Sequence, residues 1–236
     1  MGNWFKSVGE AFYNAWVPEQ RYKAYFSGLR MTLLISLFAV IIGVVIGIIL
    51  AVIRVSSRHS KSRIIAVLNV IAKLYITVIR GTPMIVQILI IYNLIFTSAD
   101  TNPVVVGAVC CGINSAAYVA EIIRAGIESI PIGQMEAGRT LGMPYHMTMS
   151  SIILPQAIRN ILPAHGNEFI SLIKETSVIS IIAVNDLTKM AGYVGSRTWD
   201  MIPPYMIAAG FYLAMTLGLT KLLSVIEKRM EKSERK

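Results

Sequence analysis

Two carboxylates and an ammonium stand inside one apolar segment late in the chain. The segment is NEFISLIKETSVIS, residues 167–180, in which the charged side chains lie among Phe, Ile, Leu and Val. A helix turns by about 100° per residue, so five polar positions fall within an arc of about 120°. These positions, which we call the polar stripe, are Asn167, Glu168, Ser171, Lys174 and Glu175.

The polar stripe matches the charges of a zwitterion. Its two carboxylates, about 10 Å apart along a helix axis, can receive an ammonium or a basic side chain. Its amide, hydroxyl and ammonium groups can donate hydrogen bonds to a carboxylate. The stripe is therefore a candidate binding site for an amino acid, and two acids per chain would also tolerate a cationic one. Gln87, and more weakly Tyr92, are candidates for the opposite wall of such a site.

The composition indicates that this segment lies in a membrane. Of the 236 residues, 55% are hydrophobic and 15% are charged, and the mean hydropathy is +0.62. Soluble domains usually carry about 25% charged residues. Residues 34–53 form a run of 20 without a charge, long enough to cross a hydrocarbon core of about 30 Å. The predicted fold class is an all-α membrane protein.

Inside a membrane, the charges of the polar stripe need a physical reason. An ionised side chain at the bilayer centre costs about 2.5–3.5 kcal/mol on insertion scales. We favour a substrate pathway, since a polar helix face must meet protein or water rather than lipid. The alternative is structural, with Lys174 paired to Glu175 or to a neighbouring span. A second pair of charges, Glu121 and Arg124, is three residues apart and is predicted to be a structural ion pair.

About five transmembrane helices are expected. The predicted spans are residues 27–53, 80–97, 103–126, 160–184 and 205–225. Three regions follow from them, namely an amphipathic N-terminal segment at 1–26, a transmembrane domain at 27–225 and a basic tail at 226–236.

Basic residues predict the orientation of these spans. Residues 54–63 hold four Lys or Arg and no acid, and the tail from Lys221 holds six against three Glu. Both are therefore expected in the cytoplasm, whereas residues 97–102 and 186–200 are expected outside. An even number of crossings must separate two cytoplasmic segments, which places the N-terminus outside. We attribute the formal charge of +9 to such loops rather than to nucleic-acid binding.

The parity of the crossings decides how the region before the second span is interpreted. Residues 64–79 are predicted to be an amphipathic lead-in at the cytoplasmic interface, with Pro83 near the start of the true span. In the first span, Gly43 and Gly47 form a GxxxG pair that could seat another helix closely. Chance is the alternative, because such pairs are common in membrane helices.

The predicted cytoplasmic loop PIGQMEAGRTLGMPYHMTMSSIILP, residues 131–155, carries signals for two short helices around a tight turn. Pro131 suits the first turn of a helix, and Gly142 suits the left-handed position that ends it. Pro144 can open the next helix. An ordinary surface hairpin between two spans is the alternative.

The spacing within this loop resembles the EAA motif of ATP-binding-cassette importer permeases. That motif has EAA, three residues, Gly, nine residues and Ile-x-Leu-Pro. The loop meets each spacing with Glu136-Ala137-Gly138, Gly142 and Ile152-x-Leu154-Pro155. It departs from the motif only at Gly138, where the pattern has alanine.

From about residue 26 onward, the chain is similar to the polar amino-acid uptake branch of that family. The similarity is carried by GLRMTLLIS in the first span, VIRGTPMIVQ at 78–87, and the stretches 116–143 and 154–178. In that family, the loop holds a coupling helix that docks on a separate ATPase subunit. The resemblance thus implies docking positions, which are Glu136, Ala137, Gly138 and Gly142.

The same resemblance implies the other parts of a complex. It implies two ATPase subunits that bind ATP and Mg, a second permease subunit that is identical or paralogous, and an extracytoplasmic solute-binding protein. It also implies the cytoplasmic (inner) membrane of a bacterial cell as the location.

The sequence offers no nucleotide site or catalytic constellation of its own. It has no GxxxxGK[ST] motif and no Gly-Lys pair, so hydrolysis is expected in the partner and this chain is not expected to be an enzyme. His59, His146 and His165 are not spaced as metal ligands. Cys110 and Cys111 are interpreted as small buried hydrophobic residues. No metal or cofactor is expected on this chain.

Two functions from different classes fit these residues. The first is the transmembrane permease subunit of an ATP-driven importer for polar or basic amino acids, which forms the pathway as a dimer. The second is a self-sufficient ion-coupled carrier or channel that uses Glu168 and Glu175 as proton or cation sites. The second function leaves unexplained the loop at residues 131–155, which we call the coupling loop. We therefore favour the first function.

Overall fold

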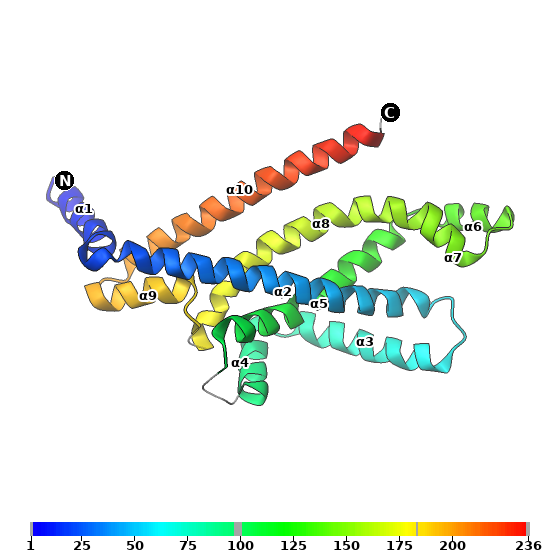
Figure 1. The fold of residues 1–236 in the computed structure, drawn as a ribbon, viewed down its shortest axis with the longest axis horizontal. Coiled ribbons are helices and arrows are strands. Elements are labelled where there is room, and N and C mark those ends of the chain that lie inside the picture. Colours follow the sequence, from blue (N-terminus) through cyan, green and yellow to red (C-terminus); the bar gives the residue numbers. More distant parts are fainter. Residues whose placement is uncertain (1, 97–100, 183, 235–236) are drawn as a thin grey trace. The chain divides into compact units, whose positions relative to one another are not determined.

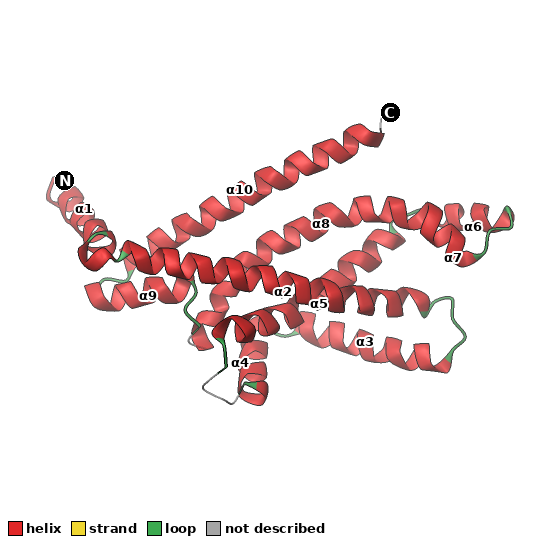
Figure 2. Ribbon diagram, in the orientation of Figure 1, coloured by secondary structure: helices red, strands yellow, loops and turns green. Residues whose placement is uncertain are grey.

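The structure is a computed structural model that describes residues 2–96, 101–182 and 184–234. Every element in these ranges is helical, and they contain no strand (Figures 1 and 2). The predicted all-α class is therefore confirmed.

Ten α-helices follow one another along the described chain. They are α1 (Gly2–Trp16), α2 (Tyr22–Ser56), α3 (Arg63–Gly81), α4 (Met84–Ile95), α5 (Pro103–Glu128), α6 (Ile132–Thr140), α7 (Tyr145–Thr148), α8 (Leu154–Glu175), α9 (Leu187–Thr198) and α10 (Ile202–Glu234). Short 3-10 helices lie at Pro18–Gln20 and Thr176–Ile182, and a π-helical turn lies at Met149–Ile153.

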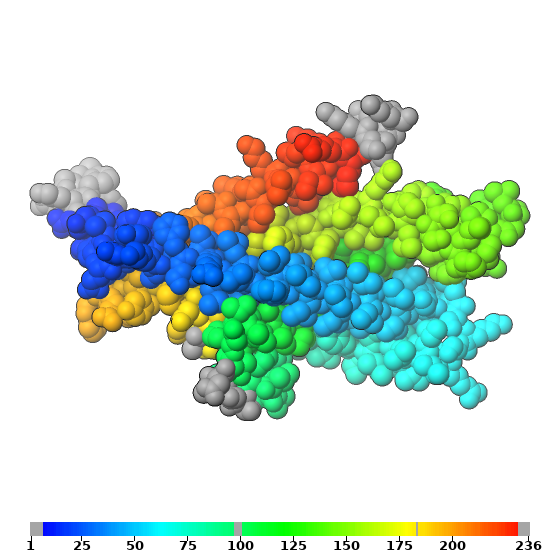
Figure 3. Space-filling model, in the orientation of Figure 1, coloured from blue at the N-terminus to red at the C-terminus, as the bar shows by residue number. Residues whose placement is uncertain are grey.

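Four segments in the described part of the chain are long and apolar enough to cross a membrane. They are Pro18–Ser56, Arg63–Gly81, Pro103–Glu128 and Ile202–Met230. The predicted spans at 27–53, 103–126 and 205–225 lie within three of them. On the face drawn in Figure 3, side chains of α2 and α3 lie at the surface, as expected for helices that meet lipid.

The region around Pro83 differs from its prediction. The expected interfacial lead-in at 64–79 is a continuous 19-residue helix, α3, with the length and apolarity of a span. The expected span at 80–97 contains only the 12-residue α4, which is about 18 Å long and too short to cross alone. The helix breaks at Thr82, whose backbone is extended at φ −123° and ψ 152°, because a following proline disfavours helical angles.

The predicted span at 160–184 corresponds to α8 and the 3-10 helix after it. α8 begins at Leu154, earlier than predicted, because the π-helical turn continues from α7 into it without a break. α8 is not among the four long apolar helices, since polar side chains interrupt its apolar run. The count of five spans and the outside N-terminus stay predictions, and of the expected outer segment 97–102, residues 97–100 lie outside the described ranges.

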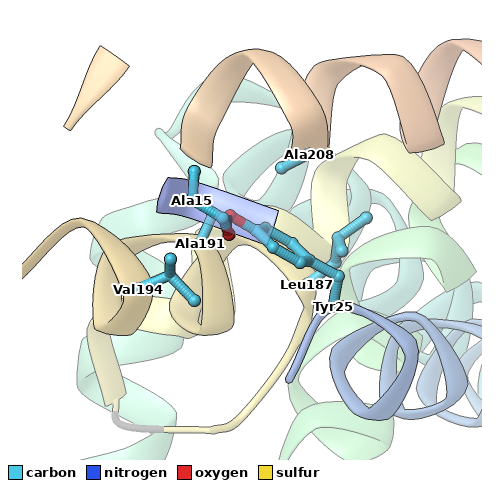
Figure 4. Packing of buried hydrophobic residues seen from close by; sticks show 6 residues of the cluster. All are labelled: Ala15, Tyr25, Leu187, Ala191, Val194 and Ala208. Carbon is cyan, nitrogen blue, oxygen red and sulfur yellow. Dashed lines mark hydrogen bonds between the residues drawn. The ribbon is translucent and has the colours of Figure 1, made fainter. Parts of the chain in front are cut away.

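Two compact units build the chain. The first comprises Met1–Ala39, Met84–Cys111 and Ser171–Leu219. Its core joins α1, α2, α9 and α10 (Figure 4) through Ala15, Tyr25, Leu187, Ala191, Val194 and Ala208. The Tyr25 hydroxyl donates to the Ala15 carbonyl at 3.4 Å, and the Trp16 and Phe211 rings stack on the Tyr25 ring at 5.6 and 6.3 Å.

Within the first unit, α2 lies close to the start of α9. A Cβ added to Gly28 would lie 2.7 Å from the Leu187 Cα, and the Leu187 backbone N–H donates to the Thr32 hydroxyl at 3.2 Å. Asp186 caps α9 by accepting from the backbone N–H groups of Thr188 and Lys189. Burial raises the pKa of Asp186, and these hydrogen bonds lower it.

The second unit comprises Val40–Pro83, Gly112–Ile170 and Thr220–Lys236. Here α2 crosses α5 at the GxxxG pair. A Cβ on Gly43 would lie 3.1 Å from the Ser115 Cβ, and one on Gly47 would lie 2.6 Å from the Val119 Cγ1. The expectation of close helix packing at this pair is confirmed.

Replacing Gly47 with alanine is expected to destabilise the protein. Its Cβ would overlap the Val119 side chain, which as a β-branched residue has little freedom to move. Overpacking of this kind costs about 1–3 kcal/mol. The measurement is the thermal unfolding midpoint of the detergent-solubilised protein. Gly218→Ala is the control because a Cβ there meets nothing within 4 Å; equal midpoints for both variants would contradict the packing.

Candidate functional site

The polar stripe lies on one continuous helix, α8 (Figure 1). Asn167 and Lys174 are exposed, and Glu168, Ser171 and Glu175 are half-buried.

Apolar side chains in the last turns of α8 pack inside the chain, whereas Ile158 and Leu162, earlier in the helix, are exposed. Leu172 and Ile173 are fully buried, and Ile170 is nearly so. The predicted amphipathic character of this helix is therefore confirmed. The polar stripe is partly open, because Asn167 and Lys174 are exposed while Glu168, Ser171 and Glu175 are half-buried.

One residue of the stripe is held by a neighbouring helix. The Ser115 hydroxyl of α5 donates to a carboxylate oxygen of Glu168 at 3.1 Å, and Ser115 is fully buried. Ser115, which lies beside Gly43 in the crossing of α2 and α5, was not predicted from the sequence. A serine in an apolar run gives little signal until its contacts are known.

The structural alternative for the stripe predicted an ion pair that the structure lacks. In residues 2–96, 101–182 and 184–234, no ion pair within 4.0 Å includes Lys174 or Glu175. Consecutive helical residues point about 100° apart and do not face each other. The charge of Lys174 nevertheless acts on the Glu175 carboxylate, and the role of the stripe stays a prediction.

The proposed opposite wall has a different environment. Gln87 of α4 is only 7% exposed, so it lies inside the first unit, whereas the stripe residues of that unit are exposed or half-buried. Tyr92 is half-buried. The role of Gln87 in binding substrate stays a prediction.

The coupling loop folds as two helices around a tight turn, as predicted. Gly142 takes φ +82°, the left-handed conformation that glycine adopts most easily. Its N–H donates to the Arg139 carbonyl at 3.0 Å, and the Met143 N–H donates to the Gly138 carbonyl at 3.1 Å. Pro131 and Pro144 stand at the N-cap positions of α6 and α7.

Most of the predicted docking positions are at the surface. Glu136, Ala137 and Gly142 are exposed. Two apolar side chains of the same loop are also open to solvent, with Ile132 77% and Leu141 82% exposed. The sequence analysis did not include these two, because only the fold shows that they lack a partner within the described chain. Exposed apolar side chains beside a carboxylate are typical of a protein-binding surface.

Gly138 differs from the other docking positions because it is buried. A Cβ there would lie 2.6 Å from the Thr148 Cγ2 and 2.9 Å from its Oγ1. This contact gives a physical reason for glycine in place of the alanine of the motif. Gly138 supports the loop from within by letting α6 approach α7.

The other chemically reactive residues are placed as follows. The described residues hold no group of His, Cys, Asp or Glu able to bind a metal ion. Cys110 and Cys111 are buried free thiols, as predicted. The His59 ring contacts the Tyr145 ring of α7 at a centroid distance of 4.5 Å, and burial raises the pKa of Tyr145. The predicted ion pair between Glu121 and Arg124 is confirmed.

Comparison with known proteins identifies the family. Residues 43–232 match the family described as the binding-protein-dependent transport system inner membrane component. The chain belongs to this family.

Several inner membrane components of this family are similar to the chain in sequence. The arginine transport system permease of Bacillus subtilis is 39% identical over 168 residues, which cover 70% of this chain and 76% of that protein. The L-cystine transport system permease of the same organism is 41% identical and covers 67% and 68%. A Rickettsia typhi permease, named provisionally for glutamine transport, is 40% identical and covers 86% and 91%.

Solved structures of such components share the fold. A crystal structure of an amino acid ABC transporter with histidines has a TM-score of 0.80 and 45% identity, covering 88% of this chain and 94% of that one. The MetNI methionine transporter in an inward-facing conformation has a TM-score of 0.71 at 18% identity, covering 92% and 99%. The second likeness concerns the fold alone.

Replacing Gly138 with alanine is expected to destabilise the coupling loop. Its Cβ would overlap the Thr148 side chain, and overpacking of this kind costs about 1–3 kcal/mol. The readout is the thermal midpoint of the solubilised protein. Thr148→Ala removes the two nearest atoms, so the double variant should recover most of the loss. Gly133→Ala is the control, since a Cβ there meets nothing within 4 Å; a single variant as stable as this control would refute the contact.

Proposed function

We propose that this inner membrane component is the permease subunit of an ATP-driven importer of polar or basic amino acids. The observation that carries the proposal is the polar stripe of α8, in which Asn167 and Lys174 are exposed, beside the buried Leu172 and Ile173. The names of the relatives, which refer to arginine, cystine and glutamine, support an amino acid as the substrate.

The polar stripe is proposed to bind both ends of the substrate. Glu168 and Glu175 receive the ammonium or a basic side chain, and Asn167, Ser171 and Lys174 donate to the carboxylate. Gln87 is proposed as a further donor or acceptor of the site. Ser115 donates to one oxygen of Glu168 and so helps to position this carboxylate.

A second permease subunit, identical or paralogous, is proposed to complete the pathway. Asn167 and Lys174 of the stripe are exposed, so a single chain leaves part of the proposed site open. A facing subunit would shield the charges from lipid, where an ionised side chain costs about 2.5–3.5 kcal/mol.

A separate ATPase is proposed to dock on the coupling loop. Glu136, Ala137 and Gly142 offer a carboxylate and close approach at the surface, Ile132 and Leu141 offer apolar area, and the buried Gly138 sets the spacing beneath them. The partner binds ATP and Mg and hydrolyses the ATP. This chain opens and closes the substrate pathway and is not itself an enzyme.

Two further elements complete the proposal. An extracytoplasmic solute-binding protein delivers the amino acid, and closure of the ATPases moves the coupling loops so that the helices alternate between outward-open and inward-open states. The complex lies in the inner membrane of a bacterial cell, with the N-terminus outside and the C-terminal tail in the cytoplasm.

Uptake measurements test the stripe. Labelled arginine, lysine, histidine, glutamine, glutamate and cystine are offered to the complete complex in vesicles loaded with ATP. We expect uptake that depends on ATP and prefers basic substrates. In Glu168→Gln/Glu175→Gln, the uptake rate of these substrates should fall at least about tenfold, because losing a charge-assisted hydrogen bond costs about 1.5–3 kcal/mol.

Asp200→Asn is the control for the stripe variant, since Asp200 is exposed and outside α8. Full uptake by the stripe variant would indicate a structural role for the stripe and would not contradict the proposed importer. Uptake without ATP would instead support a self-sufficient carrier.

Charge reversal at Glu136 tests the docking surface. Glu136→Lys is expected to abolish co-purification of the ATPase with the permease, since it replaces an exposed acceptor by a cation at the centre of the proposed contact. Glu10→Lys makes the same charge change on α1 and should leave the complex intact. Retention of the ATPase by both variants would argue against this docking surface.

A further inference from the structure

Five charged residues of the second unit form a connected series. Arg58 pairs with Glu128 at 2.7 Å, Arg124 pairs with both Glu128 and Glu121, and Arg80 reaches Glu121 at 4.0 Å. We call these five residues the charge ladder. The Arg80 guanidinium also lies 5.5 Å from the centre of the Tyr118 ring, a cation–π distance.

The charge ladder contacts the α2–α3 connection and the last turn of α3. Arg58 lies in the connection that leads into α3, and Arg80 lies in its last turn. Their partners, Glu128 and Glu121, are both on α5. Of these contacts, only the pair of Glu121 and Arg124 was predicted from the sequence. The pairing of Arg58 and Arg80 depends on how α3 packs.

One end of the charge ladder lies next to the coupling loop. α5 ends at Glu128 and α6 starts at Ile132, so a displacement of the coupling helices acts directly on the end of α5. A second contact joins the same parts, because His59, next to Arg58, packs on Tyr145 of α7. The coupling helices are thus tied both to the end of α5 and to the α2–α3 connection.

We propose that Arg80 and Glu121 form a latch that passes the movement of the coupling helices to the end of α3. Arg80 is then a positioning residue of the transport cycle. The inference rests on the proposed coupling to an ATPase. The contact between Arg80 and Glu121 is the longest of the ladder, and the Glu121 carboxylate also pairs with Arg124. The Arg80 contact can therefore form or break while the pair of Glu121 and Arg124 persists.

Partial exposure makes the latch suitable for a movement rather than for stability. The side chains of Arg80 and Glu121 are 44% and 24% exposed, and ion pairs open to water contribute little to folding. Loss of Arg80 should therefore spare the fold and alter the coupling between hydrolysis and transport.

The test measures ATP hydrolysed per amino acid imported, using labelled arginine and glutamine with the full complex in liposomes. Arg80→Gln is expected to raise this ratio about two- to thirtyfold, the range in which residues between coupled sites act. Glu121→Gln should act in the same direction. Arg80→Lys keeps the positive charge and should give a smaller increase.

Arg63→Gln is the matched control because it removes the same charge from the first turn of α3. Arg63 is exposed and belongs to none of the ion pairs among the described residues. An unchanged ratio in Arg80→Gln, even with both rates lowered together, would overturn the latch. Loss of the ATPase from the Arg80→Gln complex would also overturn it, whereas loss in Glu136→Lys tests only the docking surface.

Discussion

Charge is costly in hydrocarbon, and this constraint governs how α8 is placed. The helix buries Leu172 and Ile173 within the chain and leaves a carboxylate and an ammonium on its open side. Lipid cannot cover such a face, so the isolated chain has one surface that only water, substrate or another polar protein can satisfy. The proposals of a facing subunit and of a substrate pathway both start from this surface.

Small residues set the distances on which the rest of the structure depends. Gly43 and Gly47 let α2 approach α5 closely enough to hold Ser115 within the crossing, and Ser115 in turn positions Glu168. Gly138 plays the same part between α6 and α7. In each case the missing Cβ permits a contact that fixes a functional element, as expected where helices associate through close packing.

The two kinds of charged residue in this chain serve different purposes. On the coupling side, carboxylates and guanidinium groups neutralise one another in the charge ladder, which joins α3 and α5 and leads into the coupling loop. On α8, Lys174 and Glu175 form no ion pair within the described chain. Paired charges can hold helices together during a movement, and we propose that the charges of α8 serve a charged substrate instead.

Local signals in the sequence determined much of this protein. Apolar runs, the five-residue arc of α8, the glycine turn at Gly142 and the spacing of the coupling loop depend on helix geometry alone, so they could be predicted. The length of α3, the burial of Gly138 and the ladder contacts of Arg58 and Arg80 could not. These features depend on which distant helices pack together. The ion-pair partner of an arginine and the neighbours of a buried glycine are known only once the chain is folded. Tertiary structure therefore decided which charges are paired and which face outward.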